Sequence, residues 1–224
     1  MKQIPSDKYN VAWFTLAECV SRGEKVRAIS LYRLLAHSIK DNAFTSQLKG
    51  DLLLAFRDDS AVDLYEEAAE LYIKDNRQLE AAGVFEHLHI LNRSNCRYIR
   101  SLIKLYHVLR IESKVAIYIL KLFEALHENN NFEHAYDSIA QLEQACSFGC
   151  GTVQRKFILH LLQKKAKMSD VLELGKKLIE SFYLDGLHEK LQEFLSEIEK
   201  INEDYYLIIF EHFEFLKDKK NDSL

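Results

Sequence analysis

The sequence predicts an all-α protein of about a dozen antiparallel helices, and three observations support that prediction. Its 224 residues contain a single proline, Pro5, and 7 glycines, too few breakers for a fold of many short strands. Apolar residues make up 48% of the chain and recur at steps of three and four almost throughout. Polar clusters interrupt them at intervals of about 17 to 20 residues, which is typical of helical hairpins.

The polar breaks divide the chain into its expected helices. Ser60 and Asn95 can cap the helices that follow them, and Asp170 with Glu173 has the spacing of a capping box. Glycines that tolerate the left-handed backbone can end helices at Gly23, Gly149, Gly151 and Gly186. The helices are expected at 9–22, 25–40, 44–57, 60–75, 78–91, 95–110, 113–127, 132–146, 152–166, 169–182, 187–199 and 203–217.

The chain is expected to form one domain. No break is long enough for a linker, so a single solenoid is predicted over 9–217, after a flexible leader at 1–8 and before a mobile tail at 218–224. Neither a secretory signal nor a stretch apolar enough to span a membrane is found, which indicates a cytoplasmic protein. Reduced, mostly buried thiols are therefore expected for Cys19, Cys96, Cys146 and Cys150.

A repeat appears in the middle of the chain. Residues 65–98 place large, small and aromatic residues at fixed offsets, and the pattern recurs over 119–146 and, with a one-residue shift, over 13–40. Its positions in the clearest copy are Tyr65, Ala68, Ala69, Tyr72, Asn76, Ala81, Phe85 and Leu88. The pattern resembles the tetratricopeptide repeat (TPR), in which alanines let two helices approach closely. The resemblance implies a right-handed α-α superhelix, a TPR-like solenoid, with capping hairpins over 152–217.

The pairing of the helices stays open. The repeats start at 13, 65 and 119, which is 52 and 54 residues apart, whereas TPR units recur every 34 residues or so, so an extra helix must separate them. Helix 60–75 also fits as the second helix of its hairpin. Residues 63–88 further resemble the soluble NSF attachment protein (SNAP) family, through Asp63-Leu64-Tyr65, Ala68-Ala69 and Ala81-Ala82-Gly83. That resemblance implies an alternative function, an adaptor in vesicle trafficking or membrane fusion.

No residue pattern indicates a catalytic site, a metal site or a cofactor. Cys146 and Cys150 do not have the spacing of a zinc knuckle, and on a helix His87 and His89 would point about 200° apart. Residues 149–152 lack the lysine of a phosphate-binding loop and are interpreted as a turn. A non-catalytic protein is expected. The alternative is an enzyme or effector with a cleft between hairpins, where Cys, His and acidic side chains would converge.

The formal net charge is only -4, but the charge changes sign between adjacent hairpins. Residues 61–92 hold two basic and seven acidic side chains, whereas residues 93–125 hold seven basic and two acidic ones. Arg93, Arg97, Arg100 and Lys104 follow steps of four, three and four, which predicts a basic stripe on one helical face. The stripe either binds a partner, pairs with helix 60–75 or faces water.

A second basic block, residues 155–177, holds seven basic side chains against two acidic ones. Phe157 is its single aromatic residue, so the stacking side chains of a single-strand binder are missing, and no nucleic acid is expected as a partner. We interpret this block as a solvated face.

These features lead to a function hypothesis, a non-catalytic protein–protein interaction module or scaffold that binds a partner peptide or helix segment. In one TPR subgroup, groove lysines, arginines and asparagines clamp the acidic C-termini of chaperones. The matching positions here include Glu66, Glu67 and Glu70, which disfavours such a clamp and leaves a basic or amphipathic partner open. The stripe would suit an acidic segment, through charge from Arg93, Arg97, Arg100 and Lys104 and apolar contact from Tyr98 and Tyr106.

The oligomeric state is not predicted. The last helix, 203–217, is apolar around most of its circumference. Such a helix is expected to lie buried between neighbours, or otherwise to form a docking or dimer surface.

Overall fold

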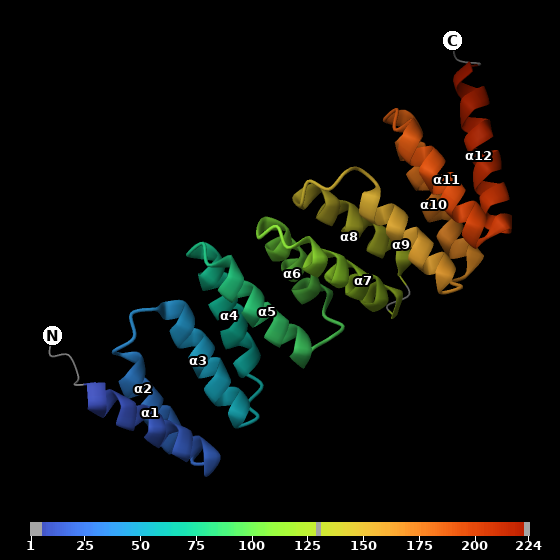
Figure 1. Ribbon diagram of the computed structural model, residues 1–224. Helices are drawn as coiled ribbons and strands as arrows, with labels where there is room; N and C mark the ends of the chain where they lie inside the picture. The colour runs from blue at the N-terminus through green and yellow to red at the C-terminus, as the bar shows by residue number, and fades with distance from the viewer. Residues whose placement is uncertain (1–5, 129–130, 222–224) are drawn as a thin grey trace. The chain divides into compact units, whose positions relative to one another are not determined.

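The computed structural model describes residues 6–128 and 131–221 (Figure 1). Within these residues it contains twelve α-helices and no strand, which confirms the all-α prediction. The helix ends lie within a few residues of the predicted ones. The helices are α1 (Ser6–Ser21), α2 (Lys25–Ala36), α3 (Asn42–Ala55), α4 (Ala61–Lys74), α5 (Gln78–Leu91), α6 (Cys96–Val108), α7 (Glu112–Glu128), α8 (Phe132–Ala145), α9 (Thr152–Gln163), α10 (Met168–Leu184), α11 (His188–Ile201) and α12 (Glu203–Asn221).

The chain divides into two compact units, Met1–Glu112 and Ser113–Leu224, where the sequence predicted one unbroken solenoid. Unit 1 contains α1 to α6, and unit 2 contains nearly all of α7 together with α8 to α12. The sequence gives no sign of this boundary, because only residues 109–111 connect α6 to α7. A connection this short looks like any other helical turn in the chain.

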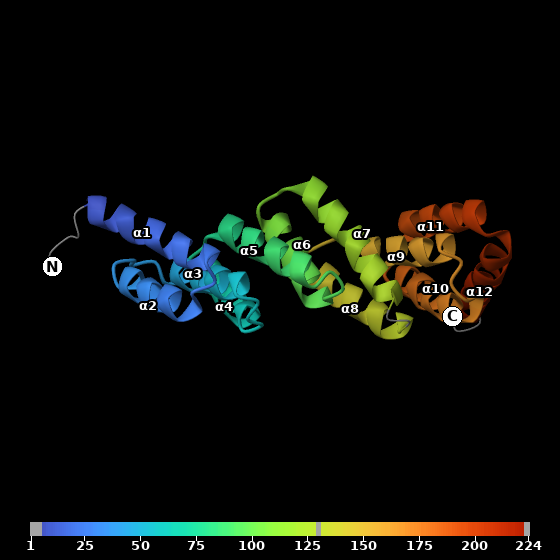
Figure 2. The same ribbon diagram turned by 90° about the horizontal axis from the view of Figure 1, so that it is seen from below.

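In unit 1 each helix packs against the next one along the chain, from α1 to α6 (Figures 1 and 2). α4 packs on both α3 and α5, and its contact with α3 is the more extensive. Ala68 and Ala69 of α4 and Ala81 of α5 are fully buried, as the expected packing of these helices requires. Close approach also requires Gly50 of α3, where a Cβ atom would lie 3.1 Å from the Tyr65 ring.

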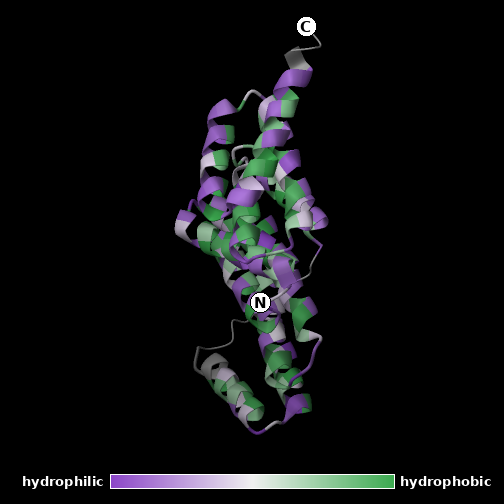
Figure 3. Cartoon of the chain, turned by 90° about the vertical axis from the view of Figure 1, so that its right-hand side faces the viewer, coloured by the Kyte–Doolittle hydropathy of each residue, from purple (hydrophilic) through white to green (hydrophobic). Residues whose placement is uncertain are grey.

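Unit 2 follows the same rule from α8 to α12, and Phe123 of α7 packs on Phe157 of α9, with 5.3 Å between ring centroids. Unit 1 and the part of unit 2 from α8 to α12 are therefore solenoid-like stacks in which consecutive helices are neighbours. Hydrophobic and hydrophilic residues are interspersed along the helices (Figure 3), as expected for amphipathic helices that bury one face.

Buried tyrosines tie neighbouring helices of unit 1 together. Four of them have the ring in the core and donate the hydroxyl hydrogen bond to an acidic or amide side chain of another helix. The bonds are Tyr65 to Asp51 (2.7 Å), Tyr72 to Gln47 (2.9 Å), Tyr98 to Glu66 (2.6 Å) and Tyr106 to Glu86 (2.8 Å). This explains why tyrosine, rather than phenylalanine, fills these positions, since a buried hydroxyl without a partner would be destabilising.

Many helices end in the same left-handed turn. In this Schellman motif the residue after the C-cap has a positive φ, and two backbone N–H groups bond back to carbonyls of the last turn. Glycine occupies the position after α1 and α10, at Gly23 and Gly186. A residue with a side chain occupies it elsewhere, with φ between 51° and 58°, at Arg57, Asn76, Arg110, Ser147 and Lys165.

The capping predictions were partly right. The Asn95 side chain accepts from the N–H of Arg97 at 3.0 Å and caps α6 as predicted. The Ser60 side chain makes no capping bond, because its hydroxyl instead donates to Asp58. Asp170 does not begin a helix either, since α10 already starts at Met168.

A buried carboxylate takes the place of a cap at the start of α9. Its N-cap residue, Gly151, has a φ of 68° and no side chain. Glu143 of α8, with 4% of its surface exposed, accepts hydrogen bonds from the N–H groups of Gly151 (3.0 Å), Val153 and Gln154 (3.0 Å). The turn predicted at residues 149–152 is thus confirmed for 150–151, and a distant side chain holds it in place.

The ends of the chain depart from the prediction. Residues 6–8 belong to α1 and residues 218–221 to α12, so the predicted leader and tail are helical there; residues 1–5 and 222–224 lie outside the described part. Helix α12 buries Tyr205, Ile209 and Phe213 but exposes its opposite side, so the expected burial holds for one face only. None of the described helices is long and apolar enough to span a bilayer.

Candidate partner-binding surfaces

The predicted basic stripe is only partly a single surface. Arg93 lies in the connection that precedes α6, because Asn95 caps the helix and Cys96 is its first residue. Arg97, Arg100 and Lys104 do belong to α6. Arg97 and Lys104 are exposed, while Arg100 is half-buried. The expected alignment of all four side chains along one helix is therefore wrong for Arg93.

Arg97 pairs with the acidic helix α4. Its guanidinium lies 2.9 Å from a carboxylate oxygen of Glu66 and 3.4 Å from one of Glu70. Tyr98 donates to the other Glu66 oxygen, so Glu66 joins two residues of α6. The alternative interpretation of the stripe, pairing with helix 60–75, is thus confirmed for Arg97. An exposed pair of this kind contributes little stability, about 0–1 kcal/mol.

The two tyrosines proposed for partner contact are buried. Tyr98 exposes 4% of its surface and Tyr106 exposes 5%, and both hydroxyls bond to glutamates of unit 1. Burial and the Glu66 hydrogen bond raise the pKa of Tyr98 to about 12. Their spacing on the apolar side of α6 fits burial in the core as well as contact with a partner, because an amphipathic pattern does not distinguish a core from a docking face. These rings fill the core instead of offering a surface.

An apolar surface that the sequence analysis did not single out lies on α5. Leu79 and Ile90 expose 63% and 65% of their surface, although the opposite side of the helix is buried. Leu79, Gly83 and Ile90 follow steps of four and seven, which places them on one side of the helix. Around Gly83, nothing lies within 4 Å of the position that a Cβ atom would take. We call these three residues the α5 face. In the sequence, this surface is indicated by the apolar residues that occur on both sides of α5.

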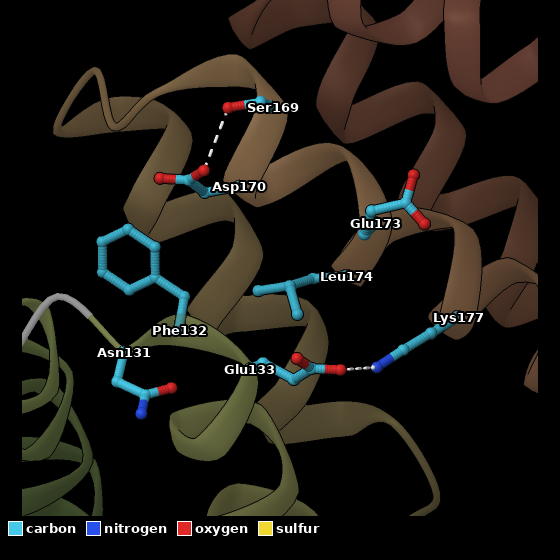
Figure 4. Close-up of a pocket in the computed structure, with 8 residues that line it drawn as sticks. All are labelled: Asn131, Phe132, Glu133, Ser169, Asp170, Glu173, Leu174 and Lys177. Atoms are coloured by element: carbon cyan, nitrogen blue, oxygen red, sulfur yellow. Dashed lines mark hydrogen bonds and ion pairs between the residues drawn. The ribbon is translucent and has the colours of Figure 1, made fainter.

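A cavity of about 540 Å³ lies in unit 2 between the starts of α8 and α10 (Figure 4). Phe132 and Leu174 form its apolar part, and Glu133 and Lys177 form an ion pair of 2.6 Å at its edge. Its remaining lining residues are Asn131, Ser169, Asp170 and Glu173. The enzyme alternative required Cys, His and acidic side chains to converge, and this cavity supplies acidic side chains without the other two.

Three of the seven basic side chains of the second block, Arg155, Lys176 and Lys177, pair with carboxylates of unit 2, and the other four are exposed, as expected for a solvated face. Arg155 lies 2.6 Å from Glu193 and 3.4 Å from Glu197, both on α11, and Lys177 pairs with Glu133. Among the described residues no cluster of histidine, cysteine and acidic side chains could hold a metal ion. None of the four cysteines forms a disulfide; Cys19 and Cys146 are buried as expected, and Cys150 is exposed.

Comparisons of the chain with known protein families and with curated proteins found no match.

Proposed function

We propose that the protein is a non-catalytic interaction module, built from TPR-like helical hairpins, and that the α5 face binds an amphipathic helix of a partner protein. The right-handed superhelix of the TPR is part of this proposal, supported by the consecutive packing of the helices and by the buried alanines.

The observation that carries the proposal is the exposed apolar side of α5. A helix with apolar residues all round is normally covered on all sides, and a partner helix would supply the missing cover. Gly83 adds to this. Glycine inside a helix costs about 1 kcal/mol relative to alanine, and no neighbouring group fills the space beside it. A glycine between two exposed apolar side chains lets a second helix approach closely.

The charges around the α5 face favour a partner with basic flanks. Glu86 lies on the same helix, three residues after Gly83, and α4 next to it carries Asp63 and Glu67. This agrees with the absence of a chaperone-tail clamp in the sequence. Lys104 of α6 is exposed and could contact an acidic residue of the same partner.

The test compares capture of partner proteins from native lysate by the tagged full chain and by the double variant Leu79→Lys/Ile90→Lys. Both positions are exposed, so the variant is expected to fold, which circular dichroism checks. Leu184→Lys, at an exposed leucine of α10, is the matched control. We expect a partner that Leu184→Lys retains and the double variant loses. A partner retained by both would remove the α5 face from the proposal, and Lys104→Glu would then test the charge on α6.

A further inference from the structure

Two other helices each leave one side uncovered. α2 exposes Val26 (82%) and Leu34 (69%), although Ala28, Tyr32 and Leu35 on its other side are buried. α12 exposes Leu207 (52%) and Phe215 (61%) opposite its buried Tyr205, Ile209 and Phe213. Both helices pack on their neighbours from one side only. Val26 and Leu34 are among the most exposed apolar side chains of the described residues.

The two exposed sides carry opposite charge. α2 contains Lys25, Arg27 and Arg33 and no acidic residue. Lys25 and Arg27 pair with carboxylates of unit 1, whereas Arg33 lies exposed beside Leu34. We call Val26, Arg33 and Leu34 the α2 face.

On α12, Leu207, Glu211 and Phe215 follow steps of four and therefore share one side of the helix. Glu211 is exposed between the two apolar residues, and Asp204 and Asp218 continue the same side at steps of three. We call Leu207, Glu211 and Phe215 the α12 face. It is apolar and acidic, where the α2 face is apolar and basic.

We propose that the α2 face of one copy of this chain binds the α12 face of a second copy, so that copies associate head to tail. The match of apolar residues flanked by opposite charges supports this pairing. Pairing α2 with α2, or α12 with α12, would bring like charges together, which disfavours symmetric dimers. A head-to-tail contact between unlike surfaces leaves one face of each kind free, so it propagates into rings or open chains. No residue of the α5 face takes part in this contact.

The contact is one helix wide on each side, which places it at the small end of specific interfaces. Association is therefore expected to be weak and to depend on concentration. The first measurement is the weight-average mass of the full chain, by sedimentation velocity, over a wide range of concentrations. We expect the mass to rise beyond that of a dimer. A monomer at every concentration would overturn the proposal.

Blocked variants test the two faces separately. Val26→Ser/Leu34→Ser removes the apolar part of the α2 face, and Leu207→Ser/Phe215→Ser removes that of the α12 face. Each variant alone is expected to stay monomeric. An equimolar mixture is expected to form dimers and nothing larger, because each variant keeps the one face that the other lacks. A mixture that stays monomeric, or a blocked variant that associates like the wild type, would contradict the head-to-tail arrangement.

A charge exchange tests the complementarity. We expect Arg33→Glu and Glu211→Arg each to weaken association about tenfold or more. The double variant Arg33→Glu/Glu211→Arg is expected to recover most of the loss, because every contact then pairs the exchanged charges. Leu184→Ser is the control for removal of an exposed leucine outside both faces, and circular dichroism confirms folding of every variant. Failure of the double variant to recover would refute the proposed pairing.

Discussion

The buried carboxylate of Glu143 is expected to be among the most important side chains for the stability of unit 2. In Glu143→Ala, the N–H groups of Gly151, Val153 and Gln154 lose their acceptor. A buried donor left unpaired costs about 1–3 kcal/mol. Because removing the carboxylate also removes its own burial cost, the low end of that range is appropriate. Three donors at the low end give a destabilisation of about 3 kcal/mol.

Urea unfolding followed by circular dichroism measures this change, and hydrogen exchange at the three amides locates it at the start of α9. Glu143→Gln keeps one acceptor oxygen and places an N–H donor at the other position, so it is expected to lose less than Glu143→Ala. Glu199→Ala, at an exposed glutamate of α11, is the control and should change the free energy of unfolding by less than about 0.5 kcal/mol. A loss below about 1 kcal/mol for Glu143→Ala, or equal losses for Ala and Gln, would refute the capping role.

Three further predictions follow from other positions. In Gly175→Ala the new Cβ would lie 1.9 Å from the Tyr205 hydroxyl oxygen, so we expect α12 to shift. The free energy of unfolding, measured by thermal or urea unfolding, should fall by about 2–3 kcal/mol. An unchanged stability would contradict this packing. Gly83→Ala should stabilise the free protein by about 0.5–1 kcal/mol and weaken partner capture, and a loss of stability would show that the site is not open. Hydrogen bonds from Lys25 and Ser60 lower the pKa of Asp58 to about 2, so the stability it contributes is present above pH 3.8 and is lost as the pH falls through about 2. An NMR titration should find that Lys25→Met raises this pKa, and an unchanged value would refute the assignment.

Local pattern was enough to predict the helices of this chain. Helix periodicity and polar breaks depend on residues a few positions apart, and the left-handed turns after α1 and α10 follow from Gly23 and Gly186 alone. α2 was predicted four residues too long, to residue 40, because nothing in 37–40 breaks the apolar pattern. The N-cap of α3 at Asp41, whose side chain accepts from the N–H of Phe44, fixes where the next helix begins.

Long-range pairing could not be predicted in the same way. Arg97 contacts Glu66 from 31 positions away, and Glu143 reaches the start of α9 around a turn, so neither bond leaves a local pattern. The sequence did suggest helix 60–75 as a partner of the basic stripe, on charge alone. It could not separate Tyr98 in the core from an exposed tyrosine, because both fit the apolar side of an amphipathic helix. The division at Glu112 left no compositional trace either.

The left-handed turns at the helix ends of this chain offer positions where substitution could stabilise the protein. At five of them a residue with a side chain adopts a backbone conformation that only glycine adopts freely, at a cost of about 1 kcal/mol each, less for asparagine. Replacing Arg57, Arg110, Ser147 or Lys165 by glycine would relieve that strain without touching either core. A thermostable version for crystallisation or cryo-microscopy could thus be assembled from substitutions at the turns, leaving the three proposed binding faces as they are.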